Sequence, residues 1–482
     1  MKLLLMRPQS RLRKIIPMGI MYIAGYLRKH MPEVETEIID LRQGDLSNNE
    51  ITELIKKSAP DIVGISAVSM EAKVTHKLIE YVKVADKNIK VIIGGPYATS
   101  LPHLALKDNN VLCCIIGEGE ETARDLLSQI SVHAHSDIFS VLPSVSGIAW
   151  SKGGEYVKNS AREYIADLDS IPVPVYDLIN LKEYFRSFGT HSGLQAHSEY
   201  SSIFTSRGCP YNCIYCHDIF GKKIRYHSAG RVIDEIQLLC NMYGVKEIHI
   251  EDDSFNLNRV RGKAIFSAIV EKGLDLKIAF PNGIRADHVD DEILNLFKKA
   301  GVYRLAYGIE TGSLSVQKQI KKRLNLDVAK NAIELTTQKG ISTHGFFMFG
   351  FLGETREDML KTVDFALRSG LHTASFSFVI PQMGTQLYHR AIEAGYNFDN
   401  IDTDQLNPGN TWINISALST EDLHRMRRMA YKQFYLNPIR IIRLYRTSPR
   451  KLILFRSFLV FLTNVLPLPI ALRERLQGML FK

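Results

Sequence analysis

Short apolar runs alternate with helical patterns along the first third of the chain. The runs are rich in Val, Ile and Leu, and the segments between them, such as 18–31 and 74–87, repeat apolar residues at the spacing of an amphipathic helix. Continuous apolar strands that alternate with such helices indicate a parallel sheet covered on both faces. The pattern predicts a doubly wound, Rossmann-like α/β domain with strands at residues 2–6, 36–40, 61–66, 90–95 and 111–117.

Small and flexible residues follow three of these predicted strands. Glycine lets the backbone approach a flat or bulky ligand closely, and ligands of doubly wound sheets bind beyond the carboxyl ends of the strands. We therefore expect a cofactor at this edge, with ordinary turn glycines of a flavodoxin-like domain as the alternative. The candidate residues are Ser66, Ser69, Gly94, Gly95, Gly117 and Glu118.

Further strand-and-helix units follow in the central third of the chain. A set of six such units within about 200 residues describes an incomplete parallel barrel, whose active groups are expected at the carboxyl ends of the strands. The strands are expected within residues 201–206, 247–253, 277–289, 304–313, 343–355 and 373–385.

The length of 482 residues is too great for one compact core. Hydrophobic residues make up 45% and charged residues 23%, as in ordinary folded proteins. The string "ADLDSIPVPVYDLIN" has two prolines and no long periodic run, which predicts an extended connector. The predicted division is a Rossmann-like domain at 1–150, a connector at 151–198, a partial barrel at 199–415 and a basic helical tail at 416–482.

The net charge of +9 comes from the C-terminal tail, residues 416–482. From Ser416 onward there are 13 Lys and Arg against 3 Asp and Glu, so the remaining 415 residues carry 47 basic and 48 acidic side chains. A nucleic-acid enzyme would more often spread basic residues around its active-site mouth, so no nucleic-acid partner is expected.

The tail combines arginines with apolar stretches. Arg456, Asn464, Pro467 and Pro469 interrupt its apolar run, which argues against a helix that spans a bilayer. The composition suits a helix in the membrane interface, attracted to anionic lipid. A helical cap on the barrel with a solvated basic face is the alternative.

Three cysteines lie close together in the string "SRGCPYNCIYCHDIF", directly after the first barrel strand. Cys209, Cys213 and Cys216 could hold a metal centre, whereas a structural zinc site would need a fourth ligand. His217 would strain to close the same site, and Cys240 lies in an apolar helical stretch that suggests packing. The apolar run at the N-terminus is too short for a signal peptide, so a cytoplasmic location is expected, where disulfides are disfavoured.

This loop resembles the Cys-x3-Cys-x-aromatic-Cys signature of the radical S-adenosylmethionine (SAM) superfamily, with Tyr215 as the aromatic residue. The resemblance implies that Cys209, Cys213 and Cys216 bind three irons of a [4Fe–4S] cluster. The fourth iron is left for SAM, whose reductive cleavage gives methionine and a 5′-deoxyadenosyl radical.

Later strings resemble the SAM-binding segments of the same superfamily. "EDDSF", "PNGIRAD" and "YGIETGS" end barrel strands, while "FGFLGET" and "IPQMGT" depart from the usual pattern because Leu352 and Met383 replace prolines. For the arginine in this set, an ordinary surface salt bridge is the alternative. The residues that the resemblance assigns to SAM are Glu251, Asp252, Arg285 and Glu310.

The strings "DIVGIS", "VIIGGPYATSLP" and "IIGEGEETARDLL" resemble the cobalamin-binding domain of cobalamin-dependent radical SAM enzymes. The first 160 residues lack the Asp-x-His-x-x-Gly loop that supplies a lower cobalt ligand in many cobalamin proteins. The departure argues against a histidine-ligated cobalt more than against cobalamin. A first domain that does not bind cobalamin is the alternative.

The two resemblances together imply a cobalamin-dependent methyltransferase that acts on an unactivated carbon of a small molecule. If the tail binds a membrane, we expect this substrate to be lipid-like. The alternatives are a cobalamin-dependent cyclase or rearrangement enzyme, a radical SAM enzyme without cobalamin, and a non-catalytic iron–sulfur electron relay. The expected partners are a reducing donor of the flavodoxin or ferredoxin type and, through the tail, the inner face of the membrane.

Overall fold

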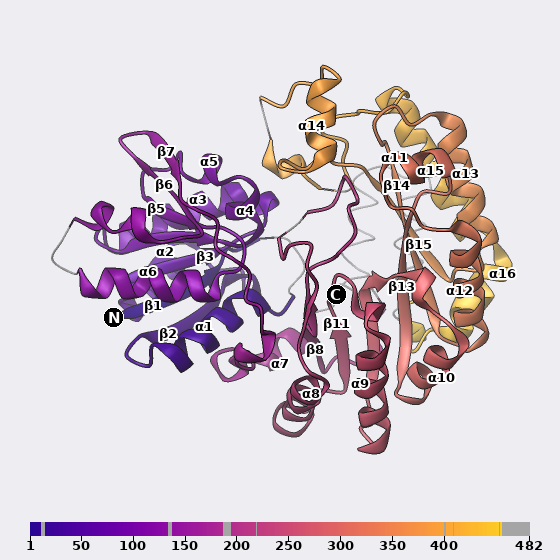
Figure 1. The fold of residues 1–482 in the computed structure, drawn as a ribbon, viewed down its shortest axis with the longest axis horizontal. Helices are drawn as coiled ribbons and strands as arrows, with labels where there is room; N and C mark the ends of the chain where they lie inside the picture. The colour runs from indigo at the N-terminus through magenta and orange to yellow at the C-terminus, as the bar shows by residue number, and fades with distance from the viewer. Residues whose placement is uncertain are drawn as a thin grey trace.

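The computed structural model describes residues 1–455 except 11–14, 134–136, 187–193, 218, 400, 401, 408 and 453, so most of the predicted membrane-interface segment lies outside the described residues. Figure 1 shows two α/β lobes side by side, the N-terminal lobe in indigo and purple and the second lobe in red to yellow. Each lobe has a sheet with helices around it, which confirms the predicted fold class.

The N-terminal lobe contains a seven-stranded sheet in the order β2-β1-β3-β4-β5-β6-β7. The five predicted strands are confirmed, and they pair in parallel. They are β1 (Lys2–Arg7), β2 (Glu35–Asp40), β3 (Ile62–Ser66), β4 (Lys90–Gly94) and β5 (Val111–Ile115). The helices of this lobe are α1 (Met18–His30), α2 (Asn48–Ser58), α3 (Ala72–Ala85), α4 (Gly95–Ser100), α5 (Pro102–Ala105) and α6 (Glu120–Val132).

Alternate side chains of β1 show how both faces of this sheet are covered. Leu3 and Leu5 belong to the core that α1 and α6 form on one face, while Leu4 and Met6 belong to the core that α2 and α3 form on the other. Because successive strand residues point to opposite faces, a continuous apolar run is what a sheet buried on both sides requires.

The two remaining strands, β6 (Ile148–Lys152) and β7 (Glu155–Lys158), form an antiparallel hairpin that the sequence pattern did not reveal. Gly153 and Gly154, both with positive φ, form its two-residue turn, the backbone that such tight hairpins need. The outer strand is mostly exposed and polar, so it lacks the apolar run by which the other strands were recognised. The sheet thus continues as far as Lys158.

The second lobe is an open barrel of six parallel strands in chain order, as predicted. These strands are β8 (Tyr200–Ile203), β11 (Glu247–Ile250), β12 (Lys277–Ile284), β13 (Val302–Glu310), β14 (Ser342–Phe349) and β15 (Thr373–Phe378). Between β8 and β11, the short strands β9 (Ser206–Arg207) and β10 (Arg225–Tyr226) pair with each other. The helices from the connector onward are α7 (Leu181–Phe185), α8 (Ala229–Tyr243), α9 (Arg259–Glu271), α10 (Asp291–Lys299), α11 (Leu314–Gln319), α12 (Leu326–Gln338), α13 (Arg356–Arg368), α14 (Gln386–Glu393), α15 (Thr420–Tyr435) and α16 (Pro438–Thr447).

Strand β15 is the last strand of the open barrel, so its outer edge needs other hydrogen-bond partners. Helix α15 supplies them: the backbone N–H of Phe376 donates to the Tyr431 hydroxyl at 3.1 Å, and that of Ala374 donates to the Tyr435 hydroxyl at 3.0 Å. Tyr435 donates back to the Ala374 carbonyl at 2.7 Å. The tail therefore begins by completing the barrel.

One continuous apolar core joins the two lobes through the connector. It includes Leu5 of the first sheet, Leu168 and Tyr176 of the connector, and Ile236 of the barrel helix α8. The Tyr176 hydroxyl also donates to the buried Glu235 carboxylate at 2.7 Å. The lobes are thus held by burial as well as by polar contacts.

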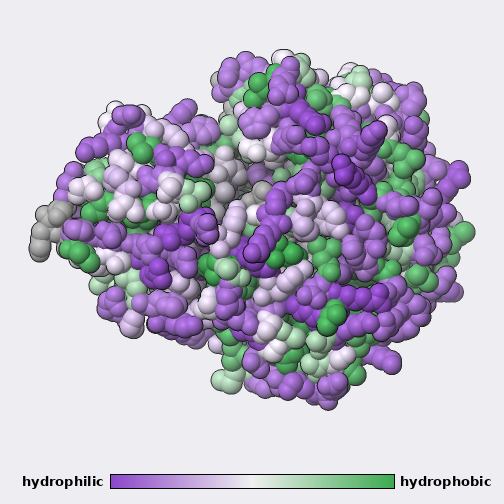
Figure 2. All heavy atoms as spheres, in the orientation of Figure 1, coloured by the Kyte–Doolittle hydropathy of each residue, from purple (hydrophilic) through white to green (hydrophobic). Residues whose placement is uncertain are grey.

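Hydrophilic residues cover most of the face drawn in Figure 2, and the hydrophobic residues on it form small groups. Among the helices in the described part of the chain, none combines the length and apolar character needed to cross a bilayer.

Candidate active site

A cavity of about 590 Å³ lies between the two lobes. On one side it is lined by the strand ends of the N-terminal sheet and by α1 and α6, and on the other by barrel residues beside the cysteine loop. Of the residues predicted from sequence, the cavity lining brings together Ser66, Gly94, Gly95, Gly117, Glu118 and Glu251. Ser69 is in the turn that follows β3 and is not among the described lining residues.

Two glycines leave open space in this cavity, Gly94 at the end of β4 and Gly19 near the start of α1. A Cβ atom added to Gly94 or Gly19 would meet no other atom within 4 Å, and both residues line the cavity. The φ of Gly94 is −131°, an extended value that any residue can adopt. Glycine is therefore not required there by backbone conformation, but it keeps room for a ligand.

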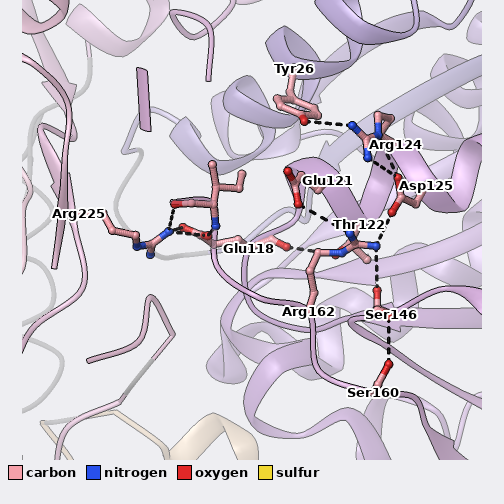
Figure 3. Close-up of polar contacts among 11 residues, drawn as sticks. Tyr26, Glu118, Glu121, Thr122, Arg124, Asp125, Ser146, Ser160, Arg162 and Arg225 are labelled. Atoms are coloured by element: carbon pink, nitrogen blue, oxygen red, sulfur yellow. Dashed lines mark hydrogen bonds and ion pairs between the residues drawn. The ribbon is translucent and has the colours of Figure 1, made fainter. Parts of the chain in front are cut away.

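Glu118 lines the cavity, but its carboxylate is engaged between the lobes (Figure 3). It accepts hydrogen bonds from Arg225 at 2.9 and 3.0 Å, as Figure 3 shows. It also accepts from Arg207 at 2.9 Å and from the backbone N–H of Ile165 at 3.0 Å. Arg207 also donates to Glu120 at 2.6 Å. We call Glu118, Glu120, Arg207 and Arg225 the interlobe ion-pair cluster.

All four side chains of this cluster are about 95% buried. The arginines offset the cost of burying the carboxylate, and they hold the pKa of Glu118 below its ordinary value. Arg207 is also 5.1 Å from the ring centroid of Tyr22 on α1. Since Arg207 lies two residues before Cys209, the cluster connects the strand ends of the first lobe with the cysteine loop.

The cysteine loop leaves β9 through a tight turn at Gly208. This residue has a φ of +92°, and an added Cβ would lie 2.7 Å from the Lys223 carbonyl oxygen, so only glycine fits. Beyond it, the Ser254 hydroxyl donates to the Cys209 sulfur at 3.3 Å, and the Cys216 N–H donates to the Cys213 carbonyl at 3.3 Å.

The thiols of the loop influence one another electrostatically. Burial raises the pKa of Cys213, and it raises the pKa of Cys216 to about 12, with the Cys213 and Cys209 thiols as further causes, although part of Cys216 reaches solvent. Iron binding therefore has to displace protons from these thiols.

In the described part of the chain, no three His, Cys, Asp or Glu side chains converge on the position of a single metal ion. This spacing does not conflict with an iron–sulfur cluster, because a cubane takes each cysteine on a different iron. The three thiols share one loop at the mouth of the barrel, with Ser254 beside Cys209. Their donor chemistry and their common loop fit a [4Fe–4S] cluster.

The two acidic residues that follow β11 have different surroundings. Glu251 lines the cavity and accepts a hydrogen bond from Ser202 at 3.0 Å. Asp252 is completely buried beneath the cysteine loop, where it accepts bonds from the Thr205 N–H at 2.6 Å, the Thr205 hydroxyl at 2.5 Å and the Ser206 hydroxyl at 2.6 Å. Burial raises the pKa of Asp252. Its contacts hold the backbone that leads into the cysteine loop.

Glu310 ends β13 with a φ of +66°, a value that is uncommon for residues other than glycine. Such backbone strain is often found at functional sites. Its carboxylate accepts a hydrogen bond from Lys322 at 3.1 Å. The charge of Lys322 in turn partly opposes the burial that raises the pKa of Cys213. Lys322 has no sequence motif, and only the fold brings its ammonium group to the thiols.

Arg285 is near the same thiols, and the Cys213 thiol contributes to its raised pKa. Arg285 forms a salt bridge with Asp287 through two hydrogen bonds, but the arginine is buried and not at the surface, unlike the surface salt bridge considered as the alternative. Its guanidinium carbon is 4.0 Å from the ring centroid of Tyr211. The guanidinium group of Arg285 therefore lies beside the cysteine loop with Asp287 as its counter-ion.

Comparisons with known proteins agree with this arrangement. The model of the Radical SAM superfamily matches residues 203–366, and that of the B12 binding domain matches residues 10–127. A protein of Pyrococcus horikoshii described as an uncharacterized methyltransferase is 30% identical over 448 residues, with 91% of this chain and 93% of that protein covered. The chain belongs to the cobalamin-binding radical SAM enzymes.

Two further comparisons are informative. The cytidylyl-2-hydroxyethylphosphonate methyltransferase of Streptomyces wedmorensis is 30% identical, with 82% of each chain covered. The solved structure of the cobalamin-dependent SAM radical enzyme OxsB, with aqua-cobalamin and SAM bound, superposes with a TM-score of 0.72 at 18% identity, over 99% of this chain and 75% of that chain. The latter likeness shows the shared fold.

Proposed function

We propose that this radical SAM enzyme transfers a methyl group to an unactivated carbon of a small molecule, with cobalamin as its second cofactor. The observation that carries the proposal is the cavity that both lobes line, with Gly94 and Gly117 on one side and Glu251 on the other. When bound, the cluster with SAM supplies a 5′-deoxyadenosyl radical, and cobalamin supplies the methyl group. The lobes enclose the space in which the substrate would be held away from water.

The proposed roles of the chain's own residues follow from their contacts. Cys209, Cys213 and Cys216 hold the cluster. Glu251 and Glu310 face SAM as hydrogen-bond acceptors, and Asp252 acts through Thr205 and Ser206, to which it is bonded.

Two cations are proposed to orient the SAM carboxylate. They are Lys322 and Arg285, which both act on the Cys213 thiol electrostatically. A carboxylate is held best by a charge-assisted hydrogen bond in a site from which water is excluded. Both cations already have acidic partners, Glu310 and Asp287, which fix their positions.

The first lobe fits a bulky cofactor. The inner part of the cavity is apolar, with Leu5, Ile92, Ile115 and Leu126 in its walls. Gly94, at the end of β4, leaves open space beside it. Ser66, Ser69, Gly94, Gly95, Gly117 and Glu118 stay our proposed cobalamin-side residues, with Glu118 acting through the interlobe cluster. No histidine is among the described residues of the cavity wall, so a histidine ligand to cobalt is not part of the proposal.

The Gly94→Leu variant is expected to lose cobalamin binding while it keeps its iron. A leucine side chain would project from an unstrained backbone into the open space that we assign to the corrin. Cobalt and iron content after anaerobic reconstitution measure the two sites separately. Gly230→Leu is the matched control, because Gly230 is exposed at the start of α8 and is not among the residues that line the cavity. Full cobalt loading of Gly94→Leu would contradict the assignment.

The Lys322→Ala variant is expected to bind SAM about tenfold more weakly, because a charge-assisted hydrogen bond contributes about 1.5–3 kcal/mol. The change also leaves the Glu310 carboxylate uncompensated beside the SAM site. Titration of the iron-loaded protein with SAM measures the dissociation constant. Lys321→Ala is the control, since that neighbouring lysine pairs with Gln386 at the surface. If the two variants bound SAM with equal affinity, the assignment of Lys322 to the SAM site would be wrong.

The function itself is tested by comparing the metabolites of a deletion strain with those of its parent. Methyl transfer predicts a pair of compounds that differ by one CH₂ group, and the label of methyl-deuterated SAM should appear in the heavier one. A different mass change would favour the cyclisation or rearrangement alternative. The reductant in such assays is proposed to be a flavodoxin or ferredoxin, because the cluster requires a low-potential electron.

A further inference from the structure

Helix α16 places arginines against the protein and apolar side chains toward the outside. Arg440 is only 6% exposed, and it donates to the carbonyl oxygens of Leu371 at 2.6 Å and Leu367 at 2.9 Å. Arg443 donates to the Gly370 carbonyl at 2.8 Å. These carbonyls lie at and just beyond the end of α13, where a helix leaves its last C=O groups without internal partners. The arginines therefore attach α16 to the barrel.

The opposite face of α16 carries large apolar side chains in solvent. Ile439 is 68% exposed, and Ile442 and Tyr445 are each 52% exposed. These residues are three apart in sequence, so they share one side of the helix. Leu452 and Phe455 follow, with 66% and 59% exposed. Single exposed apolar residues are ordinary, whereas a group on one element marks an interaction surface.

The charged residues of α16 and of the segment that follows it are of one sign. Between Asp422 and Glu474 the sequence has no Asp or Glu, while Arg446, Arg450 and Lys451 accompany the apolar side chains, and the Lys451 ammonium is 4.9 Å from the ring centroid of Tyr445. Long cationic side chains can extend past apolar neighbours to reach phosphate groups. Apolar anchors with flanking cations suit the headgroup region of an anionic bilayer.

We infer that the outer face of α16, defined by Ile439, Ile442, Tyr445, Arg446 and Lys451, docks the enzyme on a membrane surface that carries anionic lipid. Figure 1 places α16 on the outer side of the barrel lobe, away from the N-terminal lobe. Docking there leaves the cavity between the lobes uncovered. The contact is peripheral, because α16 itself is held to the barrel by Arg440 and Arg443.

Co-sedimentation of the full chain with vesicles tests this inference. The protein is expected to bind vesicles of phosphatidylcholine with 30% phosphatidylglycerol (roughly the charge range of anionic membranes) and to bind pure phosphatidylcholine far less. Raising the salt concentration should weaken the binding. The Ile439→Glu/Ile442→Glu double variant should lose about tenfold or more in affinity for the anionic vesicles.

The matched control is Val260→Glu/Met242→Glu, which adds the same charge at residues that are 82% and 72% exposed on α9 and α8. It should bind vesicles as the unmodified protein does. Equal binding by the two double variants, or no binding of the unmodified protein to anionic vesicles, would overturn the inference. So would concentration-dependent self-association in sedimentation velocity that the Ile439→Glu/Ile442→Glu change abolishes, since it would assign the face to a second copy of the chain.

Discussion

The Cys213→Ala protein is expected to form no 5′-deoxyadenosine from SAM above background under anaerobic reducing conditions. Cys213 is the central thiol of the loop, and it interacts electrostatically with Cys209, Lys322 and Glu310. A cluster that loses one of its three thiolates cannot keep the arrangement in which one iron is left for SAM. Chromatography of the reaction mixture measures the product, and the iron content should fall with it.

Cys240→Ala is the control for this experiment. Cys240 is a partly buried thiol that packs against the core from α8, so its removal changes packing without touching the loop. We expect it to keep both iron and SAM cleavage. Undiminished 5′-deoxyadenosine formation by Cys213→Ala would reject the cluster assignment and, with it, the proposed radical chemistry.

The Glu118→Ala variant is expected to lose about 3–5 kcal/mol of stability, the usual effect of breaking a buried ion pair from one side. The change removes the shared acceptor of Arg207, Arg225 and the Ile165 N–H. Arg225 then loses its carboxylate partner in this cluster, while Arg207 keeps Glu120. We expect the thermal unfolding midpoint to fall by about 5 °C or more. Circular dichroism during heating measures it.

The control pair lies at another contact of the first lobe with the connector. Arg28 and Asp177 form two hydrogen bonds, but their side chains are 50% and 56% exposed. Exposed pairs contribute about 0–1 kcal/mol, so Arg28→Gln should change the midpoint little. If the unfolding midpoint of Glu118→Ala were no lower than that of Arg28→Gln, the interlobe ion-pair cluster would contribute no more to stability than an exposed pair.

The same variant separates a positioning role from simple loss of stability. Arg207 precedes the cysteine loop and also pairs with Glu120, so the cluster sets how the strand ends of the first lobe face the loop. At a temperature where Glu118→Ala is folded, we expect it to cleave SAM while it methylates less substrate for each 5′-deoxyadenosine formed. If the ratio of methylated product to 5′-deoxyadenosine did not change, Glu118 would contribute to stability alone and would have no positioning role.

The apolar pattern was sufficient to predict the fold because both lobes are built from strands that are buried on both faces. The apolar runs that contain Leu5, Ile65 and Ile93 predicted strands correctly, since a parallel sheet covered on both faces needs continuous apolar strands. The β6–β7 hairpin was not predicted, because its outer strand is exposed and its stability comes from pairing with the sheet edge. The division into four segments remains a prediction.

Glu118 and Lys322 illustrate the limits of motif reading for the site. Glu118 belongs to a motif that predicts its position at the sheet edge where the cofactor binds. The motif cannot show that Arg207 and Arg225 donate hydrogen bonds to the Glu118 carboxylate. Lys322 has no motif, and its role depends on a hydrogen bond to Glu310 across a gap of 12 residues. Ionic contacts of this kind depend on the fold, and sequence spacing does not encode them.

The sequence by itself determined the three-thiol loop and the alternation of strands and helices, because ligand spacing and strand burial are local properties of the chain. Only the tertiary structure decided that one cavity joins the two lobes, that buried arginines bridge them, and that α16 turns its isoleucines outward. The physical reason is that each of these features depends on which distant segments exclude water from one another.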